Sequence, residues 1–283
     1  MESKWRKEVV CKISELFNPE LLIEGLKNSL FGKRVIFKES IGSTNIFLKG
    51  LAQEGAVEGT LVVADEQSAG LGRLGRQWFS KKGENLLFSV LLRPNLPARR
   101  VFVLTMIFAL AGIDAVQDLS GLNVMIKWPN DIYIRQKKVG GILTEFSVRE
   151  GIVQYVVLGM GLNVNWNPDQ KLLYATSSIY SESKKRIARE ILLCNILDKL
   201  EMYYQKVDGD MKERDGLFKM WNEKSLVIGK KVAMETGNES VEGEVEGIDR
   251  DGALILVTAG GQRRKFLCGD VSVKMNLGKQ RRS

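Results

Sequence analysis

Apolar residues recur at helical spacing in two segments near the N-terminus. These segments are residues 5–17 and 20–30, and Asn18-Pro19 separates them. Because asparagine is a good N-cap and proline fits the first turn of a helix, the pattern predicts two short helices. A brief strand is expected at residues 35–37, and residues 42–45 are expected to form a turn that caps a helix running through residue 51.

Strand-forming runs dominate the middle of the chain. Predicted strands at residues 60–65 and 85–92 flank a glycine-rich segment, and a buried helix is predicted at residues 101–119. Four further strands, with turns at residues 135–137 and 149–151, are expected to form an antiparallel meander. These four strands are residues 124–128, 132–134, 139–146 and 154–164.

The periodicity changes from helical to strand-like near residue 225. Before that point, apolar positions in residues 184–207 repeat with the spacing of an amphipathic helix. After it, short β runs alternate with Gly-Asn, Asp-Gly and Gly-Gly turns, a pattern typical of a small barrel. The predicted β runs are residues 227–234, 241–247, 253–258, 264–267 and 271–273.

The predicted organisation has four parts in an α+β chain. They are an N-terminal helical extension at residues 1–34, a mixed sheet flanked by helices at residues 35–225, a small β-barrel at residues 226–275 and a basic tail at residues 276–283. At 283 residues and 44% hydrophobic content, the chain is long enough for one sizeable core and a small second unit.

The chain contains no histidine, which excludes several kinds of active site. Ser-His-Asp triads, histidine-ligated zinc and histidine general bases all require that residue. Catalysis by positioning and fixed positive charge does not require it. The scattered residues Cys11, Cys194 and Cys268 fit neither a disulfide framework nor a paired-cysteine metal site, so we expect reduced thiols with structural roles.

The net charge of +8 could indicate nucleic-acid binding, but half of it lies in the tail after residue 273. A basic end without acidic residues is more often solvated than a nucleic-acid patch. Apolar stretches such as residues 101–111 are shorter than the roughly 20 residues of a membrane span. No apolar signal-peptide core follows Lys7. We therefore expect a cytoplasmic protein without membrane contact.

A glycine-rich segment between two predicted strands, Ala69 to Arg76, contains three glycines and two arginines. Glycine lets backbone amides approach a ligand, and arginine offers paired donors for phosphate and carboxylate. The segment lacks the Gly-Lys-Ser/Thr ending of a P-loop and the helix that follows a dinucleotide fingerprint. It is interpreted either as an anion-binding loop or as a flexible connector, and the residues alone do not separate the two.

The segment from Lys127 to Asp131 reads Lys-Trp-Pro-Asn-Asp and places polar side chains where a predicted strand turns. Asp131 could hold magnesium or orient an amine, whereas an ordinary hairpin turn with Trp128 in the core is the simpler interpretation. Lys138 follows seven residues later and precedes Gly140-Gly141. Glycines inside a strand indicate the close approach of a ligand or another backbone. Taken singly, Lys138 would be a solvated lysine.

Taken together, these segments resemble the biotin protein ligase family in order and spacing. The resemblance extends over residues 35–275 and implies a mixed-sheet catalytic domain with a C-terminal SH3-like barrel. It also implies an enzyme that converts biotin and magnesium-ATP into biotinyl-5′-AMP and pyrophosphate, after which a lysine of a biotin carboxyl carrier protein attacks. The segments that carry the resemblance are Ser43–Asn45, Ala64–Trp78, Lys127–Asp131, Lys138–Glu145, Gly159–Asn165 and the barrel-like residues 243–252.

The same resemblance assigns roles to individual residues. Lys138, Arg73 and Asp131 are expected to take part in catalysis, with Asp131 as the Mg²⁺ ligand. An amine and a guanidinium aimed at charge shared by two reacting anions would lower the barrier to their reaction. The expected biotin contacts are Ser43, Thr44, Asn45, Gln67, Gly70, Leu71, Gly72, Arg73, Lys138 and Gly141. The expected contacts of ATP or the adenylate are Arg73, Arg76, Trp78, Lys127, Asn130, Lys138 and Asn163.

Two features depart from the family pattern. Many members have arginine at the positions of Leu71 and Leu74, so this loop keeps only Arg73 and Arg76. Repressor-type relatives begin with a winged-helix domain of about 60 residues, whereas 42 residues precede Ser43 here. We expect a monofunctional ligase without a dedicated DNA-binding module, able to form a homodimer through an exposed sheet. A biotin-responsive repressor and a lipoate or octanoate ligase are the alternatives.

Overall fold

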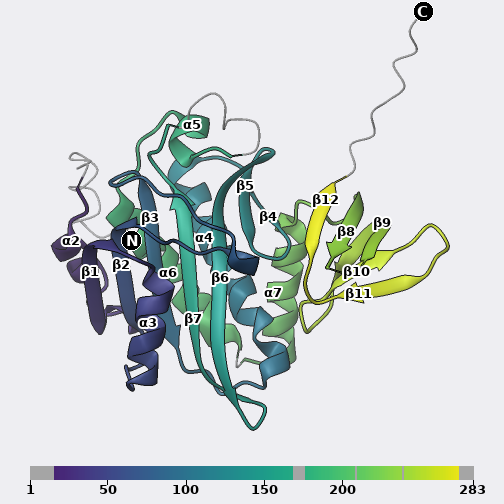
Figure 1. The fold of residues 1–283 in the computed structure, drawn as a ribbon, viewed down its shortest axis with the longest axis horizontal. Coiled ribbons are helices and arrows are strands. Elements are labelled where there is room, and N and C mark those ends of the chain that lie inside the picture. Colours follow the sequence, from purple (N-terminus) through teal and green to yellow (C-terminus); the bar gives the residue numbers. More distant parts are fainter. Residues whose placement is uncertain (1–15, 168–175, 208, 238, 274–283) are drawn as a thin grey trace, which may run out of the picture.

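A computed structural model describes residues 16–167, 176–207, 209–237 and 239–273. A seven-stranded mixed sheet forms the centre of the larger unit, in the order β1-β2-β3-β7-β6-β5-β4 (Figure 1). Strands β1 and β2 are parallel, and every other neighbouring pair is antiparallel. The strands are β1 Arg34–Ile41, β2 Thr60–Gln67, β3 Asn85–Leu92, β4 Val124–Lys127, β5 Asp131–Ile134, β6 Lys137–Arg149 and β7 Ile152–Asn163.

The meander β4-β5-β6-β7 confirms the prediction for the middle of the chain. Strand β3 has the predicted bounds, and all eight of its residues are buried because helices cover both faces of the sheet there. At the tip of the β6–β7 hairpin, Glu150 and Gly151 have φ angles of 53° and 79°. A two-residue hairpin turn with positive φ at both central positions matches the right-handed twist of the strands, so it suits the tight connection between β6 and β7.

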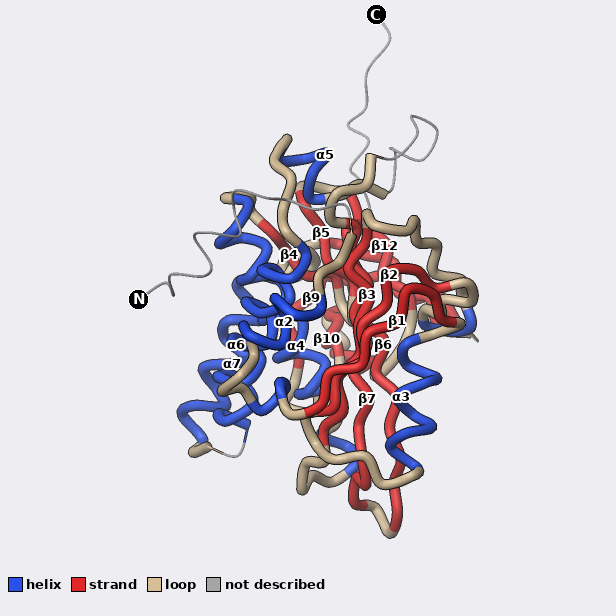
Figure 2. The backbone as a smooth tube through the Cα atoms, turned by 90° about the vertical axis from the view of Figure 1, so that its left-hand side faces the viewer, coloured by secondary structure: helices blue, strands red, loops and turns tan. Residues whose placement is uncertain are grey.

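Helices cover the two faces of the sheet unequally (Figure 2). The thicker layer consists of α2 Pro19–Gly25, α4 Phe102–Ser120, α6 Arg189–Val207 and α7 Met211–Lys224. On the opposite face, α3 Thr44–Gln53 packs alone through Leu48 and Ala52 against Val62, Leu91 and Val157 of the strands. The single helix α3 therefore leaves part of its face of the sheet available for a cavity.

The helix predictions were right in type but not always in extent. Helix α2 ends at Gly25, short of the predicted residue 30, and α6 begins at Arg189, after Lys184 in left-handed geometry ends α5 Ile179–Ser183. The helices α5 and α7 were missed. Helix α7 buries only Leu217 and Trp221, so its apolar periodicity is weak. The predicted helix at residues 5–17 lies almost wholly outside the described residues.

The span Ala98–Ser120, which contains α4, is long and apolar enough to cross a membrane, with a mean hydropathy of 1.7. This corrects the expectation that no apolar stretch reaches that length. In the structure, 78% of the span's most apolar window is buried inside the protein, against the sheet and α6. Packing on all sides accounts for the apolar composition, as in other central helices of globular proteins.

The C-terminal unit is a five-stranded antiparallel sheet in the order β11-β10-β9-β8-β12. Its contact with the larger unit is apolar and continuous, and the Trp128 indole donates a 3.0 Å hydrogen bond to the Gly252 carbonyl oxygen. The closure of this sheet into an SH3-like barrel and the four domain boundaries stay predictions. The strands are β8 Lys231–Thr236, β9 Glu239–Ile248, β10 Leu254–Val257, β11 Arg263–Phe266 and β12 Asp270–Val273.

A buried ion pair connects α6 to the end of β2. The Arg189 guanidinium lies 2.5 Å from Asp65 Oδ1 and donates a second hydrogen bond to the Asn85 carbonyl oxygen. Both charged side chains are almost fully buried. Cys194 and Cys268 form no disulfide, and they are buried and exposed respectively; Cys11 lies outside the described residues.

Removing one partner of this pair should destabilise the protein strongly. Arg189→Ala leaves the Asp65 carboxylate buried without its counter-charge, which typically costs about 3–5 kcal/mol of unfolding free energy. Urea unfolding followed by circular dichroism measures the loss. The double variant Asp65→Leu/Arg189→Met should recover most of the lost unfolding free energy, because neither position then carries a buried charge. If the unfolding free energy of Arg189→Ala lies within about 1 kcal/mol of the wild-type value, the ion pair does not contribute to stability as described.

Candidate functional site

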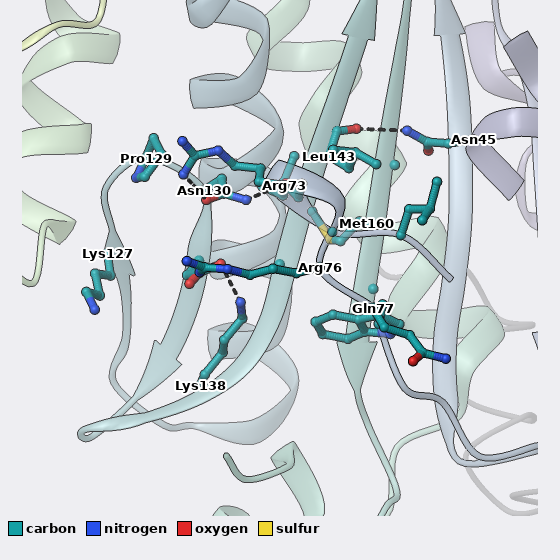
Figure 3. Close-up of a pocket in the computed structure, with 18 of the residues that line it drawn as sticks. Asn45, Arg73, Arg76, Gln77, Lys127, Pro129, Asn130, Lys138, Leu143 and Met160 are labelled. Carbon is teal, nitrogen blue, oxygen red and sulfur yellow. Dashed lines mark hydrogen bonds and ion pairs between the residues drawn. The ribbon is translucent and has the colours of Figure 1, made fainter. Parts of the chain in front are cut away.

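A cavity of about 440 Å³ opens on the face of the sheet that α3 leaves uncovered (Figure 3). Its volume is in the range of small-ligand sites. The N-terminus of α3, the glycine-rich loop, the β4–β5 turn and strand β12 all contribute to its wall. The predicted residues that line it are Ser43, Thr44, Asn45, Gln67, Leu71, Gly72, Arg73, Arg76, Trp78, Lys127, Asn130, Asp131, Lys138 and Gly141.

Two predicted site residues do not line the cavity. Asn163 is buried at the end of β7, where it accepts a hydrogen bond from Asn85 and donates one to the Ser177 carbonyl oxygen. These partners use its amide for local structure, so the structure does not support an adenylate contact. Gly70 lies behind the cavity wall, where an added Cβ would sit 2.6 Å from the Trp78 carbonyl oxygen. Because Gly70 has no side chain, the loop can pack closely against the backbone of Trp78.

Neutral polar groups gather at one end of the cavity, around the first turn of α3. The Thr44 amide donates a 2.7 Å hydrogen bond to Gln67 Oε1, and the Thr44 hydroxyl lies 3.0 Å from the same oxygen. Ser43 occupies the N-cap of α3, yet its side chain makes no capping hydrogen bond. Since an N-cap serine normally accepts from the helix backbone, its hydroxyl is left available to the cavity that it lines.

The floor of the cavity is made by glycines that sequence reasoning did not assign to the site. A Cβ on Gly159 would lie 1.9 Å from Asn45 Oδ1, and one on Gly161 would lie 2.6 Å from the Trp78 ring. Both glycines belong to β7, and β7 is buried along most of its length. Glycines inside a strand are the signal that could have identified them, because they mark the close approach of another group.

The glycine-rich loop is folded into a small hairpin, and its role in binding an anion stays a prediction. Gly72 donates a 2.7 Å hydrogen bond to the Arg76 carbonyl oxygen, and Trp78 donates one of 2.9 Å to Gly70. Leu74 adopts a left-handed conformation with φ of 56°, which is unusual for a leucine. The hairpin thereby places Arg73 and Arg76 at the cavity wall.

The opposite end of the cavity is cationic. Arg73 donates to Asn130 Oδ1 at 3.3 Å, Arg76 forms an ion pair with Asp270, and Lys138 Nζ lies 2.7 Å from Asp131 Oδ1. Figure 3 labels both members of the Arg73–Asn130 contact and shows Lys138 beside them. Four cationic side chains and two carboxylates line this cavity in the described part of the chain, so positive charge is in excess.

Strand register places Lys127 and Asp131 side by side, in a row that continues through two glycines. Lys127 on β4 lies opposite Asp131 on β5, Asp131 opposite Gly141 on β6, and Gly141 opposite Gly161 on β7. Burial lowers the pKa of Lys127, while Asp131 and Asp270 oppose that shift. Burial, helped by Asp131, raises the pKa of Tyr133 to about 12, so this phenol stays neutral beside the cations. An incoming anion would raise the pKa of Lys127 again.

Several lining residues were not predicted. Asp270 and its neighbours come from β12, almost 200 positions after the loop that they face, and no local motif marks them. Trp128 was seen in the motif but was expected to serve only the core. The remaining unpredicted residues are Gln77, Pro129, Tyr133, Ile142, Leu143, Gly159, Met160, Gly161, Thr176, Val271 and Ser272.

No group of three or more cysteine, aspartate or glutamate side chains among residues 16–167, 176–207, 209–237 and 239–273 is arranged to hold a metal ion. The carboxylates at the cavity are Asp131 and Asp270, and each already pairs with a cation. This donor set fits Mg²⁺ that arrives with a nucleotide, because Mg²⁺ usually keeps several waters and uses one or two carboxylates plus substrate phosphates.

Comparisons with known proteins match both units of the chain. Residues 37–163 match the biotin/lipoate A/B protein ligase family, and residues 227–274 match the biotin protein ligase C-terminal domain. The bifunctional ligase/repressor BirA of Bacillus spizizenii is 36% identical over 86% of this chain and 75% of its own length. The biotin–[acetyl-CoA-carboxylase] ligase of Mycobacterium tuberculosis is 31% identical over 81% of this chain and 85% of its own length.

The fold agrees with these matches. The structure of the biotin protein ligase from Aquifex aeolicus in complex with biotin and ATP superimposes with a TM-score of 0.72 and 26% identity. The similarity covers 86% of this chain and 99% of that one. With a mixed sheet flanked by helices, a C-terminal antiparallel sheet and relatives of this similarity, the chain belongs to the biotin protein ligase family.

Proposed function

We propose that this protein is an ATP-dependent biotin ligase that forms biotinyl-5′-AMP and transfers biotin to a lysine of a biotin carboxyl carrier protein. The observation that carries the proposal is the division of one cavity into a neutral polar end and a cationic end. Biotin has the matching division, with a cyclic urea at one end and a carboxylate at the other. Relatives named as biotin ligases support the same reaction.

The polar end offers both kinds of hydrogen-bonding group that a cyclic urea needs. Gln67 Oε1 accepts from the Thr44 amide, so its Nε2 must be the free donor, and the uncapped Ser43 hydroxyl is a second donor. These groups suit the urea oxygen, while the oxygens of Thr44 and Asn45 suit its N–H groups. A dithiolane or a simple alkyl chain would leave these polar groups unpaired, which disfavours lipoate and octanoate.

The cationic end suits two anions that must react with each other. A carboxylate oxygen attacks the α-phosphorus of ATP, forms a new P–O bond and releases pyrophosphate. Lys138 and Arg73 would hold the oxygens that share the developing charge, and Arg76 and Lys127 would hold the phosphates. The resting pairs with Asp131, Asn130 and Asp270 keep these side chains in place until the anions arrive.

Magnesium would enter with the nucleotide, with Asp131 as its protein ligand. When bound, Mg²⁺ would neutralise phosphate charge. In the transfer step the carrier lysine attacks the acyl carbonyl carbon and AMP leaves. The adenylate needs shielding from water in between, and the hairpin that carries Arg73 is placed to cover it.

No feature of the described residues favours DNA binding over this nucleotide-sized cavity, so we do not propose a repressor. The homodimer, the absence of membrane contact and the cytoplasmic location stay predictions.

Incubating the protein with Mg²⁺-ATP and biotin, lipoate or octanoate, and then measuring acyl-adenylates by mass spectrometry, tests the proposal. We expect biotinyl-AMP and pyrophosphate from biotin, and little adenylate from the other two acids. A pyrophosphatase-coupled assay on the same samples gives the rate of each reaction. Preferential formation of lipoyl-AMP or octanoyl-AMP would show that lipoate or octanoate, and not biotin, is the substrate. The absence of all three adenylates would refute the ligase function.

A further inference from the structure

Ser89 lies at the centre of the polar end, although it does not line the cavity. It is fully buried in the middle of β3. Its Oγ lies 2.8 Å from Thr44 Oγ1 and 2.6 Å from Asn45 Oδ1. Ser89 therefore contacts two side chains that line the cavity. Its single hydroxyl hydrogen determines which of their two oxygens receives a hydrogen bond from it.

The neighbouring hydrogen bonds fix the orientation of both amides. Gln67 Oε1 faces a backbone N–H, so it must be an oxygen and an acceptor. Asn45 Nδ2 lies 3.1 Å from the Leu143 carbonyl oxygen and 3.2 Å from Glu145 Oε2, so it must be the donor (Figure 3 draws the contact with Leu143). Consequently Asn45 Oδ1 faces Ser89 and can only accept.

A count of hydrogens then shows a deficit. Three short oxygen–oxygen contacts connect Gln67 to Thr44, Thr44 to Ser89, and Ser89 to Asn45. Each contact needs one hydrogen, but only the two hydroxyl groups can supply any, since both amide oxygens are acceptors. In every arrangement of the hydroxyls one contact lacks a hydrogen. The cluster thus has a surplus of acceptor lone pairs, and the oxygens of Thr44 and Asn45 present that surplus beside the cavity.

We infer that Ser89 is a specificity-determining residue that sets how strongly the pocket selects ligands with N–H donors. A ligand N–H can donate to Thr44 Oγ1 or Asn45 Oδ1 and supply the missing hydrogen, whereas a ligand oxygen at that place adds another acceptor. A polar site that is left unpaired by the wrong ligand discriminates strongly. Ser89 acts as a positioning residue, because it orients Thr44 and Asn45 and does not touch the ligand.

This inference rests on the proposed function, because it takes the cyclic urea of biotin as the ligand group. Without Ser89, Asn45 Oδ1 and Thr44 Oγ1 both lose the hydroxyl that contacts them. Among the described contacts, Asn45 Oδ1 then has no hydroxyl donor, so the surplus of acceptors is larger than in the wild type. The preference for an N–H donor should therefore increase while the pocket is still present.

The test uses ligands that differ from biotin in a single group. The two cyclic carbamates, in which one or the other ureido N–H is replaced by a ring oxygen, exchange a donor for an acceptor with little change in volume. Oxybiotin, in which the ring sulfur is replaced by oxygen, keeps the urea and serves as the control ligand. Calorimetry measures the Kd of each ligand for the wild type and for the variants Ser89→Ala, Ser89→Cys and Thr105→Val.

For the wild type we expect at least one carbamate to bind about 100-fold more weakly than biotin, since a buried acceptor is then opposed by another acceptor. This ratio should rise about tenfold in Ser89→Ala and by an intermediate amount in Ser89→Cys, whose S–H is a weak donor. Thr105→Val removes a buried hydroxyl that contacts Thr144 outside the cavity, so it should keep the wild-type ratio. Oxybiotin should follow biotin in every variant.

The outcomes separate the inference from the function. Failure of the wild type to bind biotin would refute the proposed function. Tight binding of biotin together with equal binding of both carbamates by the wild type would overturn the inference and leave the function standing. An unchanged ratio in a folded Ser89→Ala variant would overturn the role of Ser89. If Ser89→Ala does not fold, Ser89→Cys and the wild-type ligand series decide the question.

Discussion

Lys138→Ala should reduce the rate of adenylate formation by about 100-fold or more while the fold is kept. A fixed charge at the reacting oxygens is typically worth about 3 kcal/mol of barrier. The Lys138 ammonium lies at the cavity wall, 2.7 Å from Asp131, and its removal leaves that carboxylate to repel the incoming anions. Pyrophosphate release with saturating biotin and ATP measures the rate. Lys138→Arg should recover only part of the rate, because the planar guanidinium group does not reproduce the compact charge of an ammonium group.

Lys137→Ala is the matched control for this variant. Lys137 is the adjacent residue on β6, but its ammonium lies 3.6 Å from Glu182 and it does not line the cavity. Activity within about twofold of the wild type is expected, as for most exposed lysines. Near-normal activity of Lys138→Ala, with the same melting temperature as the wild type, would show that Lys138 takes no part in the reaction.

Arg73→Gly should separate the formation of the adenylate from its retention. Among the described residues, a single hydrogen bond of 3.3 Å, to Asn130, holds the Arg73 guanidinium, so the side chain is available to a bound anion. Its loss removes a donor from the hairpin that we propose to cover the adenylate but leaves the polar pocket intact. Free biotinyl-AMP should accumulate in the medium and label lysines of unrelated proteins.

A streptavidin blot of a bystander protein, incubated with ATP, biotin and enzyme, measures this escape. Arg73→Gly should label the bystander heavily, whereas the wild type should label mainly its carrier. Arg99→Gly is the control, because Arg99 is a helical residue outside the cavity lining. Equal bystander labelling by Arg73→Gly and the wild type, with carrier labelling unchanged, would show that Arg73 does not retain the intermediate.

The elements built from local signals were predictable from the sequence. Strand β3 has the expected bounds because a segment in which six of eight residues are apolar has few alternatives in a covered sheet. Helix α7 was missed because it buries little, although its capping box, Asp210 with Glu213, was a readable start signal. The left-handed residue Lys184, which separates α5 from α6, has no such signal because lysine rarely adopts that conformation.

The candidate site was predictable where one segment carries the chemistry and unpredictable where distant segments meet. Ser43 to Asn45 and the hairpin with Arg73 were recognised as compact motifs. Ser89 reads as one polar residue in an apolar strand, and only the packing of α3 over β3 gives it partners. Asp270 meets Arg76 from the opposite end of the chain. Such contacts are set by strand register and by the packing of the two units.

Oxygen-isotope transfer tests the central claim, an adenylate route, most directly. Biotin labelled with ¹⁸O in both carboxylate oxygens is incubated with the enzyme, Mg²⁺-ATP and a biotin carboxyl carrier protein. The carboxylate oxygen that attacks phosphorus stays with the phosphate when the carrier lysine displaces AMP. We therefore predict one ¹⁸O atom in each AMP and one in each biotinyl-lysine amide, measured by mass spectrometry. AMP without ¹⁸O, from a reaction that still biotinylates the carrier, would contradict the account.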